Sequence, residues 1–164
     1  MIENPLAAFR FLVTLDPADA YIPPAQAILL TLFVGGAFME AKGLGAELEV
    51  MGYPEGGAND FVHQLPVRHS WNRIVLRRGV VREPGLWFWY VNGLTQSLGA
   101  RRDGAIILLT PAGIPALAWI FRAGIAAKWQ GPEMSATQNA VGVESLEIAH
   151  HGLEQVILSP PLLG

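Results

Sequence analysis

Apolar and polar residues alternate with a period of two along most of this chain. The pattern is clearest in the segment 44–51, where Leu48 and Val50 alternate with Glu47 and Glu49. Because successive side chains of a strand point to opposite faces of a sheet, this alternation predicts strands with one buried face. A chain of this kind has to cover those faces with a second layer, which favours a sandwich or a barrel.

Similar alternation or short apolar runs predict strands elsewhere, and turn residues separate them. Proline and glycine mark turns at 54–57, 111–113 and 130–132. Pro66 within one run predicts a sheet edge or a break. The apolar phase slips in the last run, which predicts a bulge near Glu144 and Ser145. The other expected strands are 9–15, 61–67, 73–78, 105–110, 116–123, 125–129 and 140–150.

One helix is expected. Glu83 and Pro84 open it, since proline is favoured in a first helical turn. The residues expected to pack the helix against the rest of the molecule recur at helical spacing, and they are Leu86, Trp89, Tyr90 and Leu94. The sequence therefore predicts a mainly β fold, an antiparallel β-barrel or sandwich with one flanking α-helix, in a single domain over residues 1–164.

Two segments interrupt this pattern. An apolar insertion covers about 17–42, and an extended, irregular tail covers about 154–164. The insertion is too short in its apolar part, 25–38, to span a bilayer, so no membrane span is expected. Its apolar character still requires burial, and we expect a protein contact made by Ile28, Leu29, Leu30, Leu32 and Phe33.

The composition favours association between proteins. Hydrophobic residues make up 51% of the chain and charged residues only 15%, against about 25% charged in an average soluble domain. Such a surface has to be covered by other copies or other proteins. The net charge is -3, and the sequence contains no basic stripe of the kind that binds nucleic acid. With no cysteine, disulfides and cysteine-based zinc sites are excluded, and the N-terminus shows no secretory signal pattern.

A search for catalytic chemistry finds no nucleophile elbow, zinc-protease motif or phosphate loop. The four histidines, His63, His69, His150 and His151, lack metal-ligand spacing. We therefore expect no catalytic, cofactor-binding or metal-binding residue, and histidines at a surface or interface.

Charged residues suggest surfaces between copies. Two acidic pairs, Glu47 with Glu49 and Glu144 with Glu147, are interpreted as a solvated or lumen-facing stripe, with a glycosidase-like pair as the alternative. The arginines at 73, 77, 78 and 82 are expected to pair with acidic residues of a neighbouring copy.

Several short segments, in order, resemble one known family. They are NPLAAFRF at 4–11, GL at 43–44 with ELEV at 47–50, YPEGG at 53–57 with FVHQLP at 61–66, IVLRRGV at 74–80, LW at 86–87, RRD at 101–103, WQGP at 129–132 and VESLEIAH at 143–150. In this order the chain resembles the tail tube proteins of contractile phages and extracellular contractile injection systems. Together the segments are spread in order from residue 4 to residue 150.

The resemblance implies a structural protein, not an enzyme, with no cofactor. Family members form hexameric rings that stack into a hollow inner tube inside a sheath. The implied partners are further copies of the chain, sheath, baseplate or spike proteins and cap proteins, with room for cargo in the lumen. The implied setting is assembly in the bacterial cytoplasm into a phage tail or an injection particle.

The resemblance also suggests a contact between rings. The loop after Tyr53 is expected to reach the next ring through Gly56, Gly57, Asn59 and Phe61, with Phe61 as the apolar anchor. The glycine pair leaves this loop poorly determined by its own subunit, so a neighbour can order it.

Three alternatives remain open at this stage. The long insertion at 17–42 departs from the family pattern, which keeps open an initiator or adaptor ring that joins the tube to the spike and baseplate. A small β-barrel that binds an apolar ligand, with 25–38 as a lid, is more remote. A hydrolase that uses Glu47 and Glu49 is the most remote.

Overall fold

The computed structural model describes residues 5–8, 10–15, 38–57, 60–82, 84–95 and 101–158. The expected insertion contacts Ile28, Leu29, Leu30, Leu32 and Phe33 lie outside these ranges, and so does Asn59. The elements in the described part are β1 (Phe11–Leu15), β2 (Phe38–Lys42), β3 (Ala46–Tyr53), β4 (His63–Trp71), β5 (Ile74–Gly79), α2 (Gly85–Thr95), β6 (Arg102–Leu109), β7 (Pro115–Gln130), β8 (Val143–Ala149) and β9 (Gly152–Ile157).

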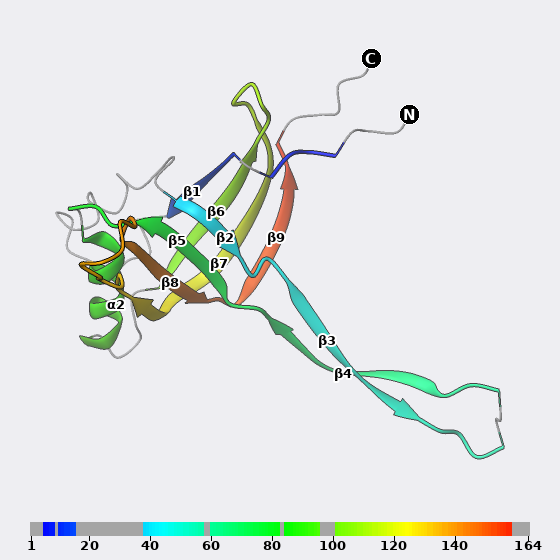
Figure 1. Ribbon diagram of the computed structural model, residues 1–164. Coiled ribbons are helices and arrows are strands. Elements are labelled where there is room, and N and C mark those ends of the chain that lie inside the picture. Colours follow the sequence, from blue (N-terminus) through cyan, green and yellow to red (C-terminus); the bar gives the residue numbers. More distant parts are fainter. Residues whose placement is uncertain are drawn as a thin grey trace.

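These elements form two parts of different character. Seven strands pair antiparallel in the order β1-β6-β7-β8-β5-β2, with β9 also paired to β7. We call these strands together with α2 the body. The other two strands, β3 and β4, pair only with each other, and they project from one end of the body as a long hairpin that we call the arm (Figure 1).

A bend in β7 lets one strand serve both halves of the body. Its first half pairs with β6 and β9, and its second half pairs with β8. The register with β6 shifts between Arg102 and Gly104, close to Ala123, which has a positive φ of 50°. Asp103 Oδ1 accepts a hydrogen bond of 2.9 Å from the Ala123 amide and so caps the irregularity. The expected strands 116–123 and 125–129 are therefore one strand with a bulge at their boundary.

The core lies where β5 and β8 face α2 and β7. Ile74 and Leu76 of β5 alternate with exposed or half-buried residues, as the sequence predicts, and Leu146 and Ile148 of β8 do the same. Leu86 and Trp89 bring α2 onto this cluster, in which Phe121 is also buried. Tyr90 is half-buried, whereas Leu94 is 68% exposed, so the expected packing of Leu94 is wrong. Leu94 is the penultimate residue of α2, and none of the described core residues covers it.

The predicted bulge near Glu144 and Ser145 is also wrong. The pairing of β8 with β5 is regular from Val143 to Ile148. The apolar phase slips because the inward position before Leu146 holds a carboxylate, Glu144, which is buried against Arg78. The register irregularity belongs to the neighbouring strand β7, between Ala126 and Lys128.

Strands extend further than expected at two boundaries. β2 occupies 38–42, which the sequence assigned to the insertion, and it pairs with β5. β9 extends to Ile157, so residues 154–157 of the expected irregular tail are a regular strand on β7. The sequence from Gly152 onward shows little alternation of apolar and polar residues. The pairing of β9 with β7 stabilises this strand, and periodicity in the sequence cannot predict such pairing.

Candidate assembly surface

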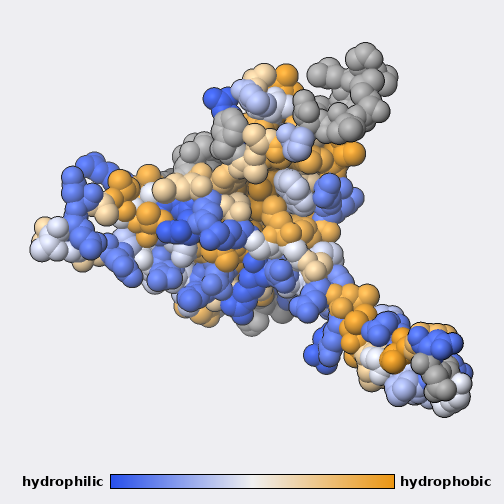
Figure 2. Space-filling view, turned by 45° about the vertical axis from the view of Figure 1, so that its right-hand side comes forward, coloured by the Kyte–Doolittle hydropathy of each residue, from blue (hydrophilic) through white to orange (hydrophobic). Residues whose placement is uncertain are grey.

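No residue of the arm belongs to the core that the described residues form. All eight residues of β3 are exposed, and so are seven of the nine in β4. Six large apolar side chains are among them, at positions 48, 50, 51, 53, 65 and 67. Figure 2 shows these apolar atoms interleaved with polar ones along the arm. An exposed, largely apolar two-stranded ribbon is not stable in isolation, which marks it as a surface for another protein.

The apolar side of the arm changes from one face to the other along its length. The register shifts between Glu49 and Val50, opposite Pro66, which confirms the predicted break at that proline. Toward the body, Leu48 and Val50 share one face of the ribbon. Toward the tip, Met51 and Tyr53 share the opposite face. The arm therefore offers two apolar faces at different distances from the body.

The tip of the arm holds the residues expected to contact a second ring. Phe61 is 58% exposed, and its ring meets the edge of His63 at 4.9 Å. His63 Nε2 lies 2.7 Å from a carboxylate oxygen of Glu55. Gly57 has φ of +96°, and a side chain added at Gly56 or Gly57 would meet nothing within 4 Å. The tip thus presents an apolar ring beside two open glycines, as a contact site requires.

The arm meets the body at a joint of two short segments, 43–45 and 72–73. Gly43 has φ of +84°, and a Cβ there would lie 1.8 Å from the carbonyl oxygen of Arg73, so only glycine fits. The Asn72 amide donates to the Gly45 carbonyl at 3.0 Å. On the body side, His150 Nε2 lies 2.9 Å from the Asn72 carbonyl oxygen.

Three of the four arginines expected to pair with a neighbouring copy pair within the chain instead. Arg73 bonds Glu147 at 3.2 Å, Arg77 bonds Glu40 at 2.8 Å, and Arg78 bonds the buried Glu144. Hydrogen bonds from Lys42 and then Arg77 lower the pKa of Glu40. The strand register explains the change, because Arg77 and Arg78 fall directly opposite or beside these carboxylates on β2 and β8.

Other places where chemistry could occur are poor in reactive groups. In the described part of the chain, no three His, Asp or Glu side chains gather as metal ligands. Glu47 and Glu49 share an exposed face of β3, with Ser70 and Arg68 opposite.

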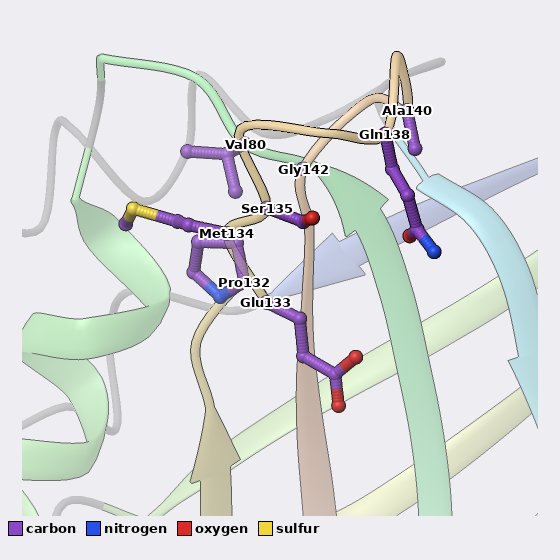
Figure 3. Close-up of a pocket in the computed structure, with 8 residues that line it drawn as sticks. All are labelled: Val80, Pro132, Glu133, Met134, Ser135, Gln138, Ala140 and Gly142. Atoms are coloured by element: carbon purple, nitrogen blue, oxygen red, sulfur yellow. The ribbon is translucent and has the colours of Figure 1, made fainter.

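A pocket of about 340 Å³ lies between Val80 and the loop 131–142 (Figure 3). Its one acidic lining residue, Glu133, points away from Ser135 and Gln138. The residues that the structure describes contain no helix long and apolar enough to cross a membrane.

The fold and the arm together define a class, a mainly β structural protein with an exposed hairpin for contacts to other proteins. Comparison of the sequence with family models makes the assignment specific. The chain belongs to the family described as T4-like virus tail tube protein gp19, whose model matches residues 7–154. This confirms the predicted resemblance and the prediction of a structural protein rather than an enzyme. No curated protein sequence matches the chain.

Solved structures share the fold. A chain of the anti-feeding prophage baseplate superposes with a TM-score of 0.78 at 24% identity, covering 94% of this chain and 97% of that one. A chain of the sheath-tube complex of the extracellular contractile injection system PVC gives 0.74 at 21% identity, with 96% and 95% covered. Hcp1 from Salmonella typhimurium is more distant, at 0.53 and 12%, with 91% and 86% covered. These likenesses confirm the mainly β fold class with one helix.

Sequence reasoning missed the joint. Its signals were present as the pair Gly43 and Gly45 and as the turn at Asn72. Neither pattern identifies His150 as their partner, because that residue is distant in sequence and reaches the joint only through the β8–β9 turn.

Proposed function

We propose that this chain is a subunit of the inner tube of a contractile injection system or a contractile phage tail, where it forms hexameric rings that stack around a lumen. The observation that carries this proposal is the arm, a long ribbon with apolar side chains on both faces that the described residues leave exposed. Membership of the tail tube family supports the same function. An arm of this kind is stable when a neighbouring subunit covers it.

Open sheet edges supply the contacts within a ring. Among the described residues β1 pairs only with β6, β2 only with β5, and β9 only with β7. Each of these strands keeps a row of backbone donors and acceptors on its free side, which a strand of another copy can satisfy. We therefore propose that strands of adjacent subunits continue one sheet around the lumen.

The arm tip supplies the contacts between rings. In this proposal Phe61 enters an apolar site on the next ring while Gly56, Gly57 and Asn59 let the loop adapt to it. The support is the exposed Phe61 ring and the open space at both glycines. For Ile28, Leu29, Leu30, Leu32 and Phe33 we propose contacts with the next ring, the sheath or the baseplate, on the basis of their apolar sequence alone.

The proposed partners are further copies of the chain, the sheath, baseplate or spike proteins, and cap proteins, with assembly in the bacterial cytoplasm. The fold neighbours come from a baseplate, a sheath-tube complex and a cap. A second candidate is an adaptor ring that joins the tube to the spike and baseplate, because the neighbour of highest TM-score among these is a baseplate chain.

Negative-stain electron microscopy of the purified protein tests the proposal. We expect rings with sixfold symmetry that stack into tubes as the concentration rises. An adaptor would give single rings that stop at one or two layers. A protein that stays monomeric at high concentration in analytical ultracentrifugation would overturn both candidates.

Shortening the arm tip separates its role from that of the body. Deletion within residues 56–60 is expected to leave rings intact but to prevent tubes. The matched control shortens the exposed turn 111–113 between β6 and β7, which belongs to the body. Tubes of normal length from the arm variant would show that the tip makes no contact between rings.

A further inference from the structure

The end of the body far from the arm carries a second group of exposed apolar side chains. The loop 131–142 lies there beside α2 and the end of β5, whereas the arm leaves from the other end (Figure 1). Met134 is 89% exposed, the most of any large apolar residue that the structure describes. We call this group the far-end patch, and it consists of Val80, Val81, Trp87, Met134 and Val141.

Contacts within the body hold the far-end patch in place. The Val80 amide donates a hydrogen bond of 2.9 Å to the Gly142 carbonyl, which ties the loop to the end of β5. A Cβ at Gly142 would lie 3.3 Å from the Cβ of Pro132, so the two sides of the loop approach closely. The ring of Trp87 meets that of Trp129 at 4.7 Å between centroids. A surface fixed in this way costs little entropy to bind.

The pocket of about 340 Å³ opens in this patch and has room for one aromatic side chain. In Figure 3 the side chains of Val80 and Met134 extend toward α2, and the carboxylate of Glu133 points the other way. Methionine adapts its shape to a partner and makes favourable contacts with aromatic rings. The pocket therefore suits an aromatic side chain from another molecule.

One charged residue borders the patch, and an opposite charge borders the arm tip. Arg82 is exposed two residues after Val80, and the ion pairs of the described residues do not include it. Asp60 is exposed directly before Phe61, and those ion pairs do not include it either. The tip therefore combines an acid with an aromatic ring, and the patch combines a base with an apolar pocket.

The tip and the patch of one molecule lie too far apart to meet. Strand β3 has eight residues and β4 has nine, which carries the tip about 25–30 Å from the joint, on the side away from the patch (Figure 1). A second copy related by translation presents its far-end patch to this tip. The complementary charges and shapes therefore fit a contact between copies.

We propose that the arm tip of one copy docks on the far-end patch of a copy in the next ring, with Phe61 in the pocket and Asp60 paired with Arg82. The proposal rests on the stacking of rings proposed above, and it adds the site that receives the arm. A buried aromatic anchor supplies most of the contact energy in such an interface, and a charge pair at its rim fixes the register.

Exchanging the two charges in the full-length protein tests the docking. Asp60→Arg alone and Arg82→Asp alone each place like charges opposite each other. Each should leave rings intact and raise the protein concentration needed for tubes about tenfold, because every copy in a layer repeats the unfavourable contact. Sedimentation and electron microscopy measure this. The combined variant, with both changes, should form tubes at nearly the wild-type concentration.

A mismatched double variant is the control. Asp60→Arg with Arg10→Asp has the same net charge, but Arg10 lies beside the turn 111–113, where it donates to the Pro111 carbonyl at 3.0 Å. This variant should stay defective. Normal tubes from both single variants, or equal rescue by the two double variants, would overturn the docking. Wild-type protein that forms no tubes would contradict the proposed function itself, so the two failures are distinguishable.

Cross-linking tests the same contact without relying on charge. The natural chain has no cysteine, so Gly56→Cys with Met134→Cys introduces one thiol at the tip and one at the pocket. A side chain at Gly56 would meet nothing within 4 Å. A short bismaleimide should link copies of successive rings into a ladder on denaturing gels. Gly56→Cys with Ile114→Cys, in the exposed turn before β7, should give no ladder. Tubes without a ladder from the first pair would assign the patch to a different partner and overturn the docking.

Discussion

The body and the arm are built from strands with the same alternation of apolar and polar residues, but only the body buries its apolar side chains. In β5 and β8 every second side chain is buried, whereas the same alternation in β3 leaves all positions exposed. Burial stabilises the fold of the body by about 1.5–3 kcal/mol for each large apolar side chain. The described residues give the arm no comparable burial. A pattern that predicts a strand therefore does not say whether its apolar face belongs to the core or to another protein.

Removing the buried carboxylate should have the largest effect on the body. Glu144 bonds Arg78 and accepts from the Trp129 indole at 3.2 Å. We expect Glu144→Ala to reduce the free energy of unfolding by about 3–5 kcal/mol, because it leaves a buried cation without its carboxylate. Chemical denaturation measures this. The control Glu147→Ala breaks a largely exposed pair on the same strand and should cost about 0–1 kcal/mol. Equal losses would show that burial does not distinguish the two pairs.

A matched leucine pair compares the two parts directly. Leu146→Ala in the core should cost about 2–5 kcal/mol of unfolding free energy. Leu48→Ala on the arm removes the same atoms from an exposed position and should change the stability of the monomer by less than about 0.5 kcal/mol. Assembly should respond in the reverse sense, with Leu48→Ala impairing tubes that sedimentation detects. Destabilisation of the dissociated monomer by Leu48→Ala would mean that the arm has a cover within its own chain.

The bend in β7 offers a stabilising change in the body. Ala123 has positive φ, which is unfavourable for a residue with a Cβ and neutral for glycine. Ala123→Gly should raise the free energy of unfolding by about 0.5–1 kcal/mol, measured by thermal or chemical unfolding. Ala105→Gly, in the regular part of β6, should lower it by about 0.5–1 kcal/mol. A loss of stability in both variants would show that the bend does not strain Ala123.

The smallest effect concerns an exposed edge of the body. The pKa of Glu40 is lowered by Lys42 and Arg77, so its ionised form is favoured in the folded protein. A lowered folded pKa gives stability that is present above the unfolded value of 4.5 and is lost as the pH falls through the folded value. Glu40→Gln should therefore slightly lower the melting temperature at neutral pH and flatten its fall in acid. If the melting temperature fell in acid as steeply in Glu40→Gln as in the wild-type protein, the contacts of Glu40 with Lys42 and Arg77 would contribute nothing to stability.

The sequence predicted those features that depend on local pattern. Alternation located the strands, and Pro66 located the break in the arm. Alternation failed at Glu144, because a buried ion pair looks like a slip of phase when its partner Arg78 is distant in sequence. Leu94 failed for a related reason, since helical spacing indicates a face but not how far the core extends along it.

For the candidate surface, the sequence predicted which kinds of residue make the contact but not the length of the arm that presents them. Glycines and an aromatic residue suggested a contact loop, and Gly56, Gly57 and Phe61 do lie at an exposed tip. The length of the arm was not predictable, because two amphipathic strands in sequence normally signal a piece of a larger sheet. The His150 contacts depend on three chain segments that meet only after folding.

The arm projects from one end of the body alone (Figure 1), which gives each molecule a front and a back. In a stack held by such arms, every copy faces the same way and new layers join a chemically distinct terminus. Such a stack has one end where the arms contact no further ring and another end where the sites that bind the arms are unoccupied. Growth in this arrangement is directional, and each terminus needs a different closing protein.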